Sequence, residues 1–473
     1  MTKQDLQDLL ALLDNSVSYK DGEVEVKDAA RLRATIHRLA EVSALESGTR
    51  QGLARYLVRV IAPKAGVFLA SINDLYMARG RGEVPTNFTV PALNLRVLAF
   101  DSARAVFRAA QPLDATAFIF EIARSEMGYT DQRPAEYVTS ILAAAITEGH
   151  SGPVFVQGDH FQVSAKRFAS DKETELQAVK DLIVEAIHAG FFNIDIDTST
   201  LVDLSKSSLA EQQALNTGLS AMYTAYIRSL EPEGVTISVG GEIGEVGGHN
   251  STEPELCAYM DGYLSELEKL DPKAVGISKI SIQTGTSHGG VVLPDGSIAK
   301  VSVDFDTLRN LSQIARQEYH TGGAVQHGAS TLPEDAFGKF VDSEAVEVHL
   351  ATNFQNMFFE LVPDELRKEM YAFLDVKSAN ERKPDMTDEQ FYYKTRKNAV
   401  GPFKKQAWNL PAANKAEISQ AWEEQFSKLF RLLGQAGTRE YVEQTIKPVN
   451  VKPSLHFFLG ETVEAGDVSD LAD

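Results

Sequence analysis

The sequence is poor in cysteine and in long apolar runs. It has 473 residues and a single cysteine, Cys257, so no disulfide can form within the chain. One cysteine is typical of a reducing compartment, and the first residues lack the pattern of a signal peptide. No run of about 18 apolar residues occurs, which argues against a transmembrane helix. We therefore expect a cytoplasmic protein that does not bind membranes.

Positive charge is also scarce. The 46 lysines and arginines are outnumbered by 66 acidic residues, and the formal net charge is -20. Nucleic acids and anionic bilayers attract proteins through an excess of basic residues, so neither is an expected partner. A small anionic ligand would instead need a local site of backbone N–H groups.

Apolar spacing divides the chain into a helical beginning, a mixed middle and a helical end. Residues 1–85 and 361–460 repeat apolar positions with a helical period, and the acidic residues 461–473 predict a loose tail. Residues 86–360 contain eight short runs typical of strands. These runs are Thr89–Asn94, Ala117–Ile122, Pro153–Gln157, Asn193–Asp197, Val235–Gly240, Lys279–Thr284, Ala324–Gln326 and Ala345–Leu350.

Longer helical stretches separate these runs, which indicates a parallel α/β sheet. They include Ala135–Thr147, Glu173–Ala189, Leu209–Leu230, Pro254–Leu270 and Phe305–Tyr319. Eight such units favour a closed (β/α)₈ TIM barrel with added helical regions at both ends. An open doubly wound sheet is the alternative, and the lack of a GxGxxG turn after the first strand weakens it.

Several predicted strands end in side chains that bind metals. His160, Glu242, His288 and His327 follow strands three, five, six and seven, and Asp197 ends strand four. In a TIM barrel the C-terminal ends of the strands meet at one mouth. Imidazole and carboxylate groups suit zinc or another divalent metal. The sequence therefore predicts one metal site, although each histidine taken alone would more often be an ordinary barrel or loop histidine.

Asp159 directly precedes His160. Side chains alternate in direction along a strand, so these two cannot point the same way in a regular strand. We interpret Asp159 as a proton-transfer group that faces the substrate. The alternative is a carboxylate that orients a ligand histidine from behind.

Glycine-rich turns follow strands six and seven. Gly289 and Gly328 allow the backbone to approach a ligand closely, and Ser330 and Thr352 lie in the same predicted loops. Loops after strands seven and eight of a TIM barrel often hold a phosphate. We expect a phosphate site there, with a plain tight turn as the alternative for each loop.

No predicted strand ends in a lysine, because Lys279 begins the sixth strand. A Schiff-base mechanism needs a lysine amine at the substrate carbonyl. The remaining way to stabilise an enediolate is a metal that acts as a Lewis acid.

These motifs resemble the class II, metal-dependent fructose-bisphosphate aldolases and their tagatose-bisphosphate relatives over residues 88–355. The elements that carry the resemblance are Thr89–Asn94, Gly158–His160, Ala189–Ser199, Gly241–Gly248, Gly285–Gly289 and His327–Ser330. The resemblance implies that Asp159 is the catalytic acid and base. It also implies that the histidine elements and Glu242 hold the metal.

The implied reaction is the reversible cleavage of a ketose bisphosphate, such as fructose 1,6-bisphosphate, to dihydroxyacetone phosphate and glyceraldehyde 3-phosphate. It would pass through a metal-stabilised enediolate. Tagatose 1,6-bisphosphate or another ketose is the alternative substrate. The resemblance further implies a phosphorylated sugar as partner and a homodimer or larger homo-oligomer, with the terminal helices as contact surfaces.

The chain departs from the family in three places. Beyond residues 247–248 an acidic pair is replaced, so His249 and Glu253 become candidate catalytic groups. His349 stands where the family usually has an asparagine that touches the substrate, and is a candidate substrate-binding residue. The basic residue for a second phosphate has no clear match, and the candidates are Arg396, Lys404 and Lys405. These departures leave open a barrel that has lost catalysis and serves as a regulatory or assembly subunit.

Overall fold

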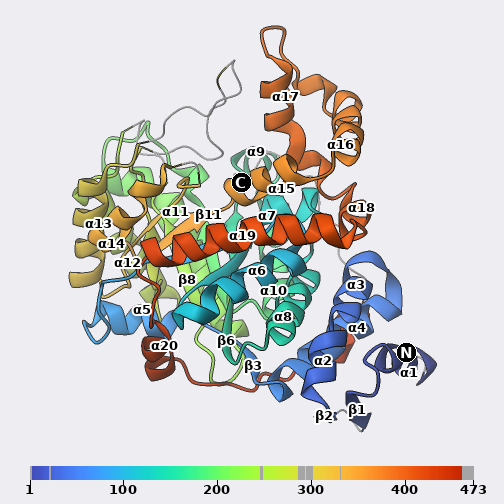
Figure 1. The fold of residues 1–473 in the computed structure, drawn as a ribbon. Helices are drawn as coiled ribbons and strands as arrows, with labels where there is room; N and C mark the ends of the chain where they lie inside the picture. Colours follow the sequence, from blue (N-terminus) through green and yellow to red (C-terminus); the bar gives the residue numbers. More distant parts are fainter. Residues whose placement is uncertain are drawn as a thin grey trace.

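A closed barrel of eight parallel strands forms the centre of the molecule, in a computed structural model that describes residues 3–20, 23–244, 249–285, 293, 302–330 and 332–460 (Figure 1). The strands are β4 (Val90–Asn94), β5 (Ile119–Ala123), β6 (Gly152–Gln162), β7 (Asn193–Asp197), β8 (Ser238–Glu242), β9 (Lys279–Ser281), β10 (Ala324–Gln326) and β11 (Glu347–Leu350). They pair in this order and β11 pairs with β4, so the ring closes. The prediction of a (β/α)₈ TIM barrel is confirmed.

Each predicted run overlaps a barrel strand, although several ends differ. β8 begins at Ser238 and continues to Glu242, and β9 already ends at Ser281. β6 continues past Gln157 as far as Gln162, because its end still pairs with β7. β6 and β7 are buried almost throughout, as expected for parallel strands that helices cover on the outside.

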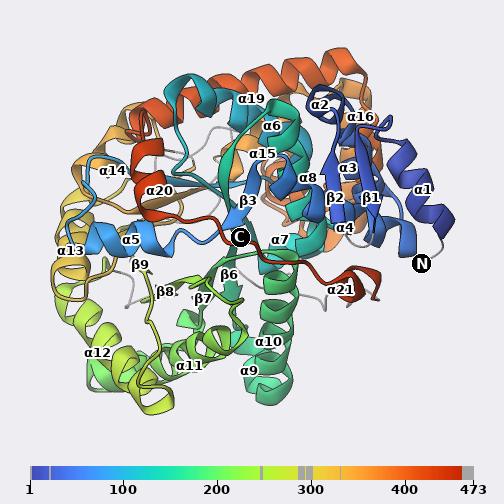
Figure 2. The ribbon, with the colours of Figure 1, turned by 90° about the horizontal axis from the view of Figure 1, so that it is seen from below.

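Helices surround the barrel in a ring (Figure 2). They are α6 (Ala99–Ala110), α7 (Arg124–Tyr129), α8 (Pro134–Glu148), α9 (Ala165–Ser170), α10 (Lys172–Ala189), α11 (Leu209–Leu230), α12 (Glu253–Leu270), α13 (Phe305–Gln317), α14 (Gly338–Asp342) and α15 (Thr352–Leu361). α10 shows why these helices end where they do. The Asp171 side chain accepts from Thr174 N at its start, and Gly190 has a φ of 111° at its end. Among the described residues, no helix is both long and apolar enough to cross a bilayer.

The N-terminal region is mainly helical, as the sequence predicts, but it also contains strands. Its helices are α1 (Lys3–Ala11), α2 (Ala29–Thr35), α3 (His37–Leu45), α4 (Gly48–Lys64) and α5 (Asn73–Gly80). β1 (Val17–Lys20) and β2 (Glu23–Val26) form a hairpin, and β3 (Val67–Ala70) pairs in parallel with the start of β6. The prediction that residues 1–85 are helical is therefore wrong for these three strands, because a short apolar run suits a strand equally well.

The C-terminal region is a set of helices that covers one side of the barrel. These are α16 (Asp364–Lys377), α17 (Asp388–Thr395), α18 (Lys404–Trp408), α19 (Ala412–Leu432), α20 (Arg439–Thr445) and α21 (Leu455–Leu459). The long α19 lies across α6 and α15 (Figure 1). Trp422 Nε1 donates to Phe354 O of α15 at 3.0 Å, and the rings of Phe426 and Phe354 lie 4.7 Å apart.

Beyond α20 the chain crosses beneath the barrel and ends in α21, which packs against α4 (Figure 2). The approach is close, since a Cβ on Gly52 would lie 1.9 Å from Phe458 O. The ring of Phe458 also meets that of Tyr56 at 6.2 Å. The last helix of the described chain is thus fastened to the N-terminal region.

Replacing Trp422 by alanine tests the contribution of α19. The side chain is 1 % exposed and would leave a cavity between α19 and α15. We expect the free energy of unfolding to fall by about 3–5 kcal/mol in a urea titration. Glu424→Ala on the exposed face of the same helix is the control and should change it by less than about 0.5 kcal/mol. Equal stability of the two variants would contradict the packing described here.

Candidate active site

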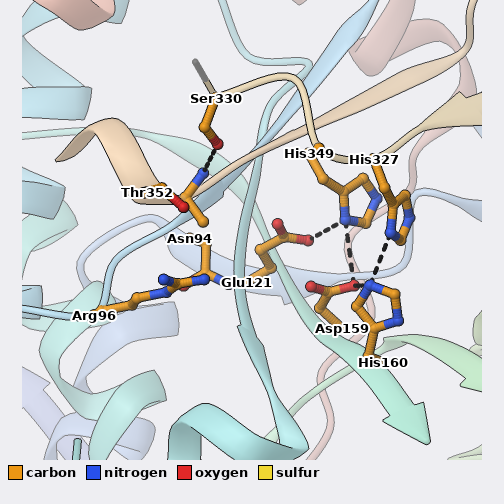
Figure 3. A pocket seen from close by; sticks show the side chains of 11 residues that line it. Asn94, Arg96, Glu121, Asp159, His160, His327, Ser330, His349 and Thr352 are labelled. Carbon is orange, nitrogen blue, oxygen red and sulfur yellow. Dashed lines mark hydrogen bonds and ion pairs between the residues drawn. The ribbon is translucent and has the colours of Figure 1, made fainter. Parts of the chain in front are cut away.

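An irregularity in β6 shapes the mouth of the barrel. The pairing with β7 jumps from Gly158 to Phe161, and His160 has a φ of +40°, in the left-handed region. Such a bulge breaks the alternation of side chains along a strand. Asp159 and His160 therefore both line one pocket, although strict alternation would direct them differently (Figure 3). Position 158 requires glycine, because a Cβ there would lie 2.3 Å from the ring of Phe161.

Three of the predicted metal ligands come together at this mouth. His160, Glu242 and His327 each offer one ligand atom, and these atoms lie within 4.8 Å of one another. His160 Nδ1 is 3.5 Å from Glu242 Oε2, and His160 Nε2 is 2.8 Å from His327 Nδ1. Two imidazoles and a carboxylate fit zinc or a similar divalent cation and leave a position for substrate. His288, the fourth predicted ligand, lies outside the described residues, as does Gly289.

Asp197 takes a supporting position beside His160. Its Oδ2 lies 3.2 Å from His160 Nδ1, while its Oδ1 accepts hydrogen bonds from the backbone N–H and hydroxyl of Ser199 at 3.0 and 2.6 Å. A carboxylate that bonds a ligand histidine fixes the orientation of the ring. Asp197 is not one of the three residues that converge as a ligand group.

The metal-free cluster holds protons that a cation would have to displace. Burial, and then the negative charge of Asp197, raise the pKa of Glu242 to about 8. Burial lowers the pKa of His160, but Asp159 and the other nearby carboxylates outweigh it, so the pKa lies well above its usual value. At neutral pH the cluster therefore contains a protonated carboxyl group and an imidazolium.

Asp159 differs from Glu242 in its charge state. Burial would raise its pKa, but His160 and His349 hold the pKa of the Asp159 carboxyl well below its usual value. It is thus a carboxylate at neutral pH, which suits a group that accepts a proton from substrate.

His349 lies between Asp159 and His327. Its ring is 4.0 Å from that of His327 at an angle of 24°. Its Nδ1 is 3.2 Å from Asp159 Oδ1 and 3.0 Å from Glu121 Oε2. The residue lines the pocket, but both of these contacts are to the protein.

The predicted phosphate residues face the same pocket from another side. Gly328, Ser330 and Thr352 line it together with His160 and His327. Figure 3 shows Ser330 and Thr352 on the side away from the two histidines. Ser330 Oγ accepts from Ala351 N at 2.7 Å, and Thr352 is the first residue of α15. The free N–H groups at a helix N-terminus favour an anion.

Three lining residues are missing from the sequence prediction. Asn94 ends β4, Arg96 lies just beyond it, and Glu121 lies in the middle of β5. Arg96 Nε donates to Glu126 Oε1 at 2.7 Å, which holds the guanidinium at the pocket wall. The rule that the strand ends meet at the mouth would have identified Asn94 and Arg96, had it been applied to the first strand, but not Glu121.

The remaining predicted site residues that the structure describes do not line this pocket. His249 is exposed and its Nε2 lies 3.7 Å from Glu255 Oε1, while Glu253 is exposed at the start of α12. The Arg396 guanidinium donates a hydrogen bond to the side-chain oxygen of Asn356. Lys404 Nζ donates to Glu136 Oε1 at 2.8 Å. Lys405 is an exposed residue of α18. The structure does not bring these residues to the metal cluster.

Lys279 is buried inside the barrel as an ammonium group. Its Nζ donates to Gln157 Oε1 at 2.7 Å, to Asp195 Oδ2 at 2.9 Å, and to Glu347. Burial would lower its pKa, but Asp195 and Glu347 outweigh burial and raise it. A charged amine with three acceptors is a poor nucleophile towards a carbonyl.

A family model described as "Fructose-bisphosphate aldolase class-II" matches residues 85–437. No curated protein matches the chain. The fructose-bisphosphate aldolase of Campylobacter jejuni is a similar solved structure, with 18% identity, 78% of this chain and 96% of that chain covered, and a TM-score of 0.47. The YdjI aldolase of Escherichia coli K12 has 13% identity, coverage of 78% and 99%, and a TM-score of 0.47. The fructuronate-tagaturonate epimerase of Cohnella laeviribosi has 13% identity, coverage of 89% and 90%, and a TM-score of 0.53. At these identities the likeness concerns the fold alone.

Titration with zinc tests the proton count of the cluster. We expect the metal-free protein to release about two protons per ion at pH 7, because Glu242 and His160 hold protons that metal ligands must lose. At pH 9 the release should be smaller by about one proton, since the Glu242 carboxyl is already ionised. A pH indicator in weak buffer measures both values. Zinc binding without proton release at pH 7 would contradict the assigned charge states.

Proposed function

Because the chain belongs to the class II fructose-bisphosphate aldolase family, we propose that it cleaves a phosphorylated ketose by a reversible aldol reaction. The products would be dihydroxyacetone phosphate and an aldehyde, with fructose 1,6-bisphosphate as the first substrate to test. One observation carries the proposal. The carboxylate of Asp159 shares a pocket with His160, His327, Ser330 and Thr352, and Glu242 completes a possible ligand group with the two histidines.

Asp159 is the proton-transfer group of this reaction. In the cleavage direction it accepts the proton of the hydroxyl group on the aldehyde side of the breaking carbon–carbon bond. That hydroxyl becomes the new carbonyl, and the bonding electron pair passes to the ketone half. His160 and His349 hold the pKa of Asp159 well below its usual value, so the side chain is ionised at neutral pH, as a proton acceptor must be. In the reverse direction the same group returns the proton.

The cluster of His160, Glu242 and His327 would hold a divalent cation such as zinc. Such a cation supplies positive charge that polarises the substrate carbonyl. Asp197 keeps His160 in orientation through its 3.2 Å contact. Ser281 Oγ lies 3.1 Å from His327 Nε2 and holds that ring from the opposite edge.

The phosphate of the ketone half would bind at the start of α15. Thr352 N–H and the backbone around Gly328 and Ser330 offer donors there. The phosphorylated sugar is thus the proposed small-molecule partner. We also propose a homodimer or larger homo-oligomer in the cytoplasm, in which the terminal helices provide the contacts.

A second candidate is the inversion of one carbon centre in a ketohexuronate. It is favoured by the similar epimerase structure, whose match extends over 89% of this chain. Cleavage of the same kind of carbon–carbon bond, followed by addition of the ketone half to the other face of the aldehyde, would invert that carbon. Incubation with fructuronate and analysis by NMR separates the two functions, because an epimerase yields tagaturonate and no net fragments.

Replacing Asp159 by asparagine tests the proton-transfer role. The amide keeps the size of the side chain but cannot accept the proton, so kcat should fall by about 10³-fold in a coupled cleavage assay. Zinc content should equal that of the unchanged protein, because Asp159 is not needed to hold the cation. Asp306→Asn, at an exposed position in α13, is the control. Loss of zinc from the Asp159 variant would instead make Asp159 a residue that supports the ligands.

Chelation and borohydride together test the class of mechanism. Removal of divalent metal should abolish cleavage, and added zinc should restore it. Borohydride with dihydroxyacetone phosphate should leave activity unchanged, because Lys279 is held as an ammonium by Asp195 and Glu347. Cleavage that survives complete metal removal would refute the metal-dependent assignment.

A further inference from the structure

His349 faces carboxylates on both edges of its ring. Nδ1 faces Asp159 Oδ1 at 3.2 Å and Glu121 Oε2 at 3.0 Å. On the other edge, Nε2 lies 2.7 Å from Glu347 Oε1 and 3.8 Å from Asp195 Oδ2. The side chain is 6 % exposed. Its two nitrogens therefore bridge carboxylates that stand on opposite sides of it.

One end of this bridge is rigid. Glu347 is completely buried and receives hydrogen bonds from Gln157 Nε2 at 2.9 Å, from Lys279 Nζ and from the hydroxyl of Tyr76. Three donors from three different elements fix this carboxylate in the barrel interior. His349 is anchored to the Glu347 carboxylate, and its ring is therefore held in a fixed position at the rim of the pocket.

The flat face of the ring makes a third contact. It stacks on His327 with the ring centroids 4.0 Å apart. The plane of the His327 ring in turn makes an angle of 88° with the plane of the His160 ring. Packing against a fixed ring limits rotation of the His327 imidazole about its side-chain bonds. The same residue thus touches the proposed proton-transfer group and a proposed metal ligand (Figure 3).

We propose that His349 is a positioning residue that holds the Asp159 carboxylate and the His327 ring in the geometry needed for cleavage. This inference rests on the proposed function. One Asp159 oxygen faces His349, which leaves the other oxygen to meet the substrate hydroxyl. An asparagine could not replace the ring, because its amide donates from one nitrogen only and cannot bridge Glu347 and Asp159.

The substitution His349→Phe tests the hold on Asp159. It keeps a flat ring over His327 and removes both nitrogens. In the zinc-loaded full chain we expect kcat for the ketose phosphate to fall about 100-fold, with KM within about threefold and zinc content unchanged. A raised KM with unchanged kcat would make His349 a substrate-binding residue and overturn the proposal, as would a loss of zinc.

The substitution His349→Asn tests the hold on His327. It removes the ring, so zinc should pass to a chelator about tenfold faster than from the unchanged protein or from His349→Phe. Equal rates of zinc transfer from the unchanged protein, His349→Phe and His349→Asn would overturn the proposed hold on His327. His188→Phe is the matched control, because that exposed imidazole stacks on Phe457 and does not line the pocket. It should change neither rate nor kcat.

Two further measurements keep the test decisive. Circular dichroism checks that each variant folds, and His349→Gln replaces any that does not, with the same expected direction of change in kcat. The zinc rates need no turnover. If the unchanged protein cleaves no ketose phosphate, the proposed function fails, while the comparison of zinc rates still decides whether His349 holds His327.

Discussion

In β6 the backbone is held on both edges, by β5 as far as Asp159 and by β7 on either side of an extra residue. This pairing sustains the left-handed conformation of His160, which an isolated strand would not adopt. Gly158 supplies the space that the Phe161 ring needs. The consequence is that two neighbouring side chains with different chemistry share one pocket. Glu242, His327 and His349 are then placed around them by strands whose ends reach the same rim.

The barrel interior beneath the site must balance a large amount of buried charge. Glu121, Asp195 and Glu347 lie within it, and charges in such a place are costly unless they are paired. Lys279 and His349 provide the opposite charge. Burial would raise the pKa of Glu347, but Lys279 outweighs it and the pKa falls to about 2. Burial and the negative charge of the nearby Asp159 raise the pKa of Glu121 to about 8. The lysine in this barrel is therefore explained by compensation of carboxylates and not by covalent chemistry.

Much of this arrangement follows from the sequence, and the exceptions have a common cause. The strands were predictable because each is a short apolar run, and the rim residues because parallel strands end at one mouth. The bulge at His160 was not, since it depends on pairing with two neighbours distant in sequence. The direction of the His349 side chain was not predictable either, because its contacts with Glu347 and Asp159 fix it. His249 and Glu253 were chosen by analogy of position, and the structure places both at the surface. His288, Gly289 and the division into domains stay predictions.

The fastening of α21 to α4 constrains how the protein can be made. The contact between Gly52 and Phe458 joins α4, which precedes the barrel in the sequence, to α21, which follows it. Part of the apolar surface of α4 must therefore stay uncovered until the barrel and α21 have been translated. Termination of synthesis near residue 450 would omit α21 and leave the surface of α4 that α21 covers open to chaperones and proteases.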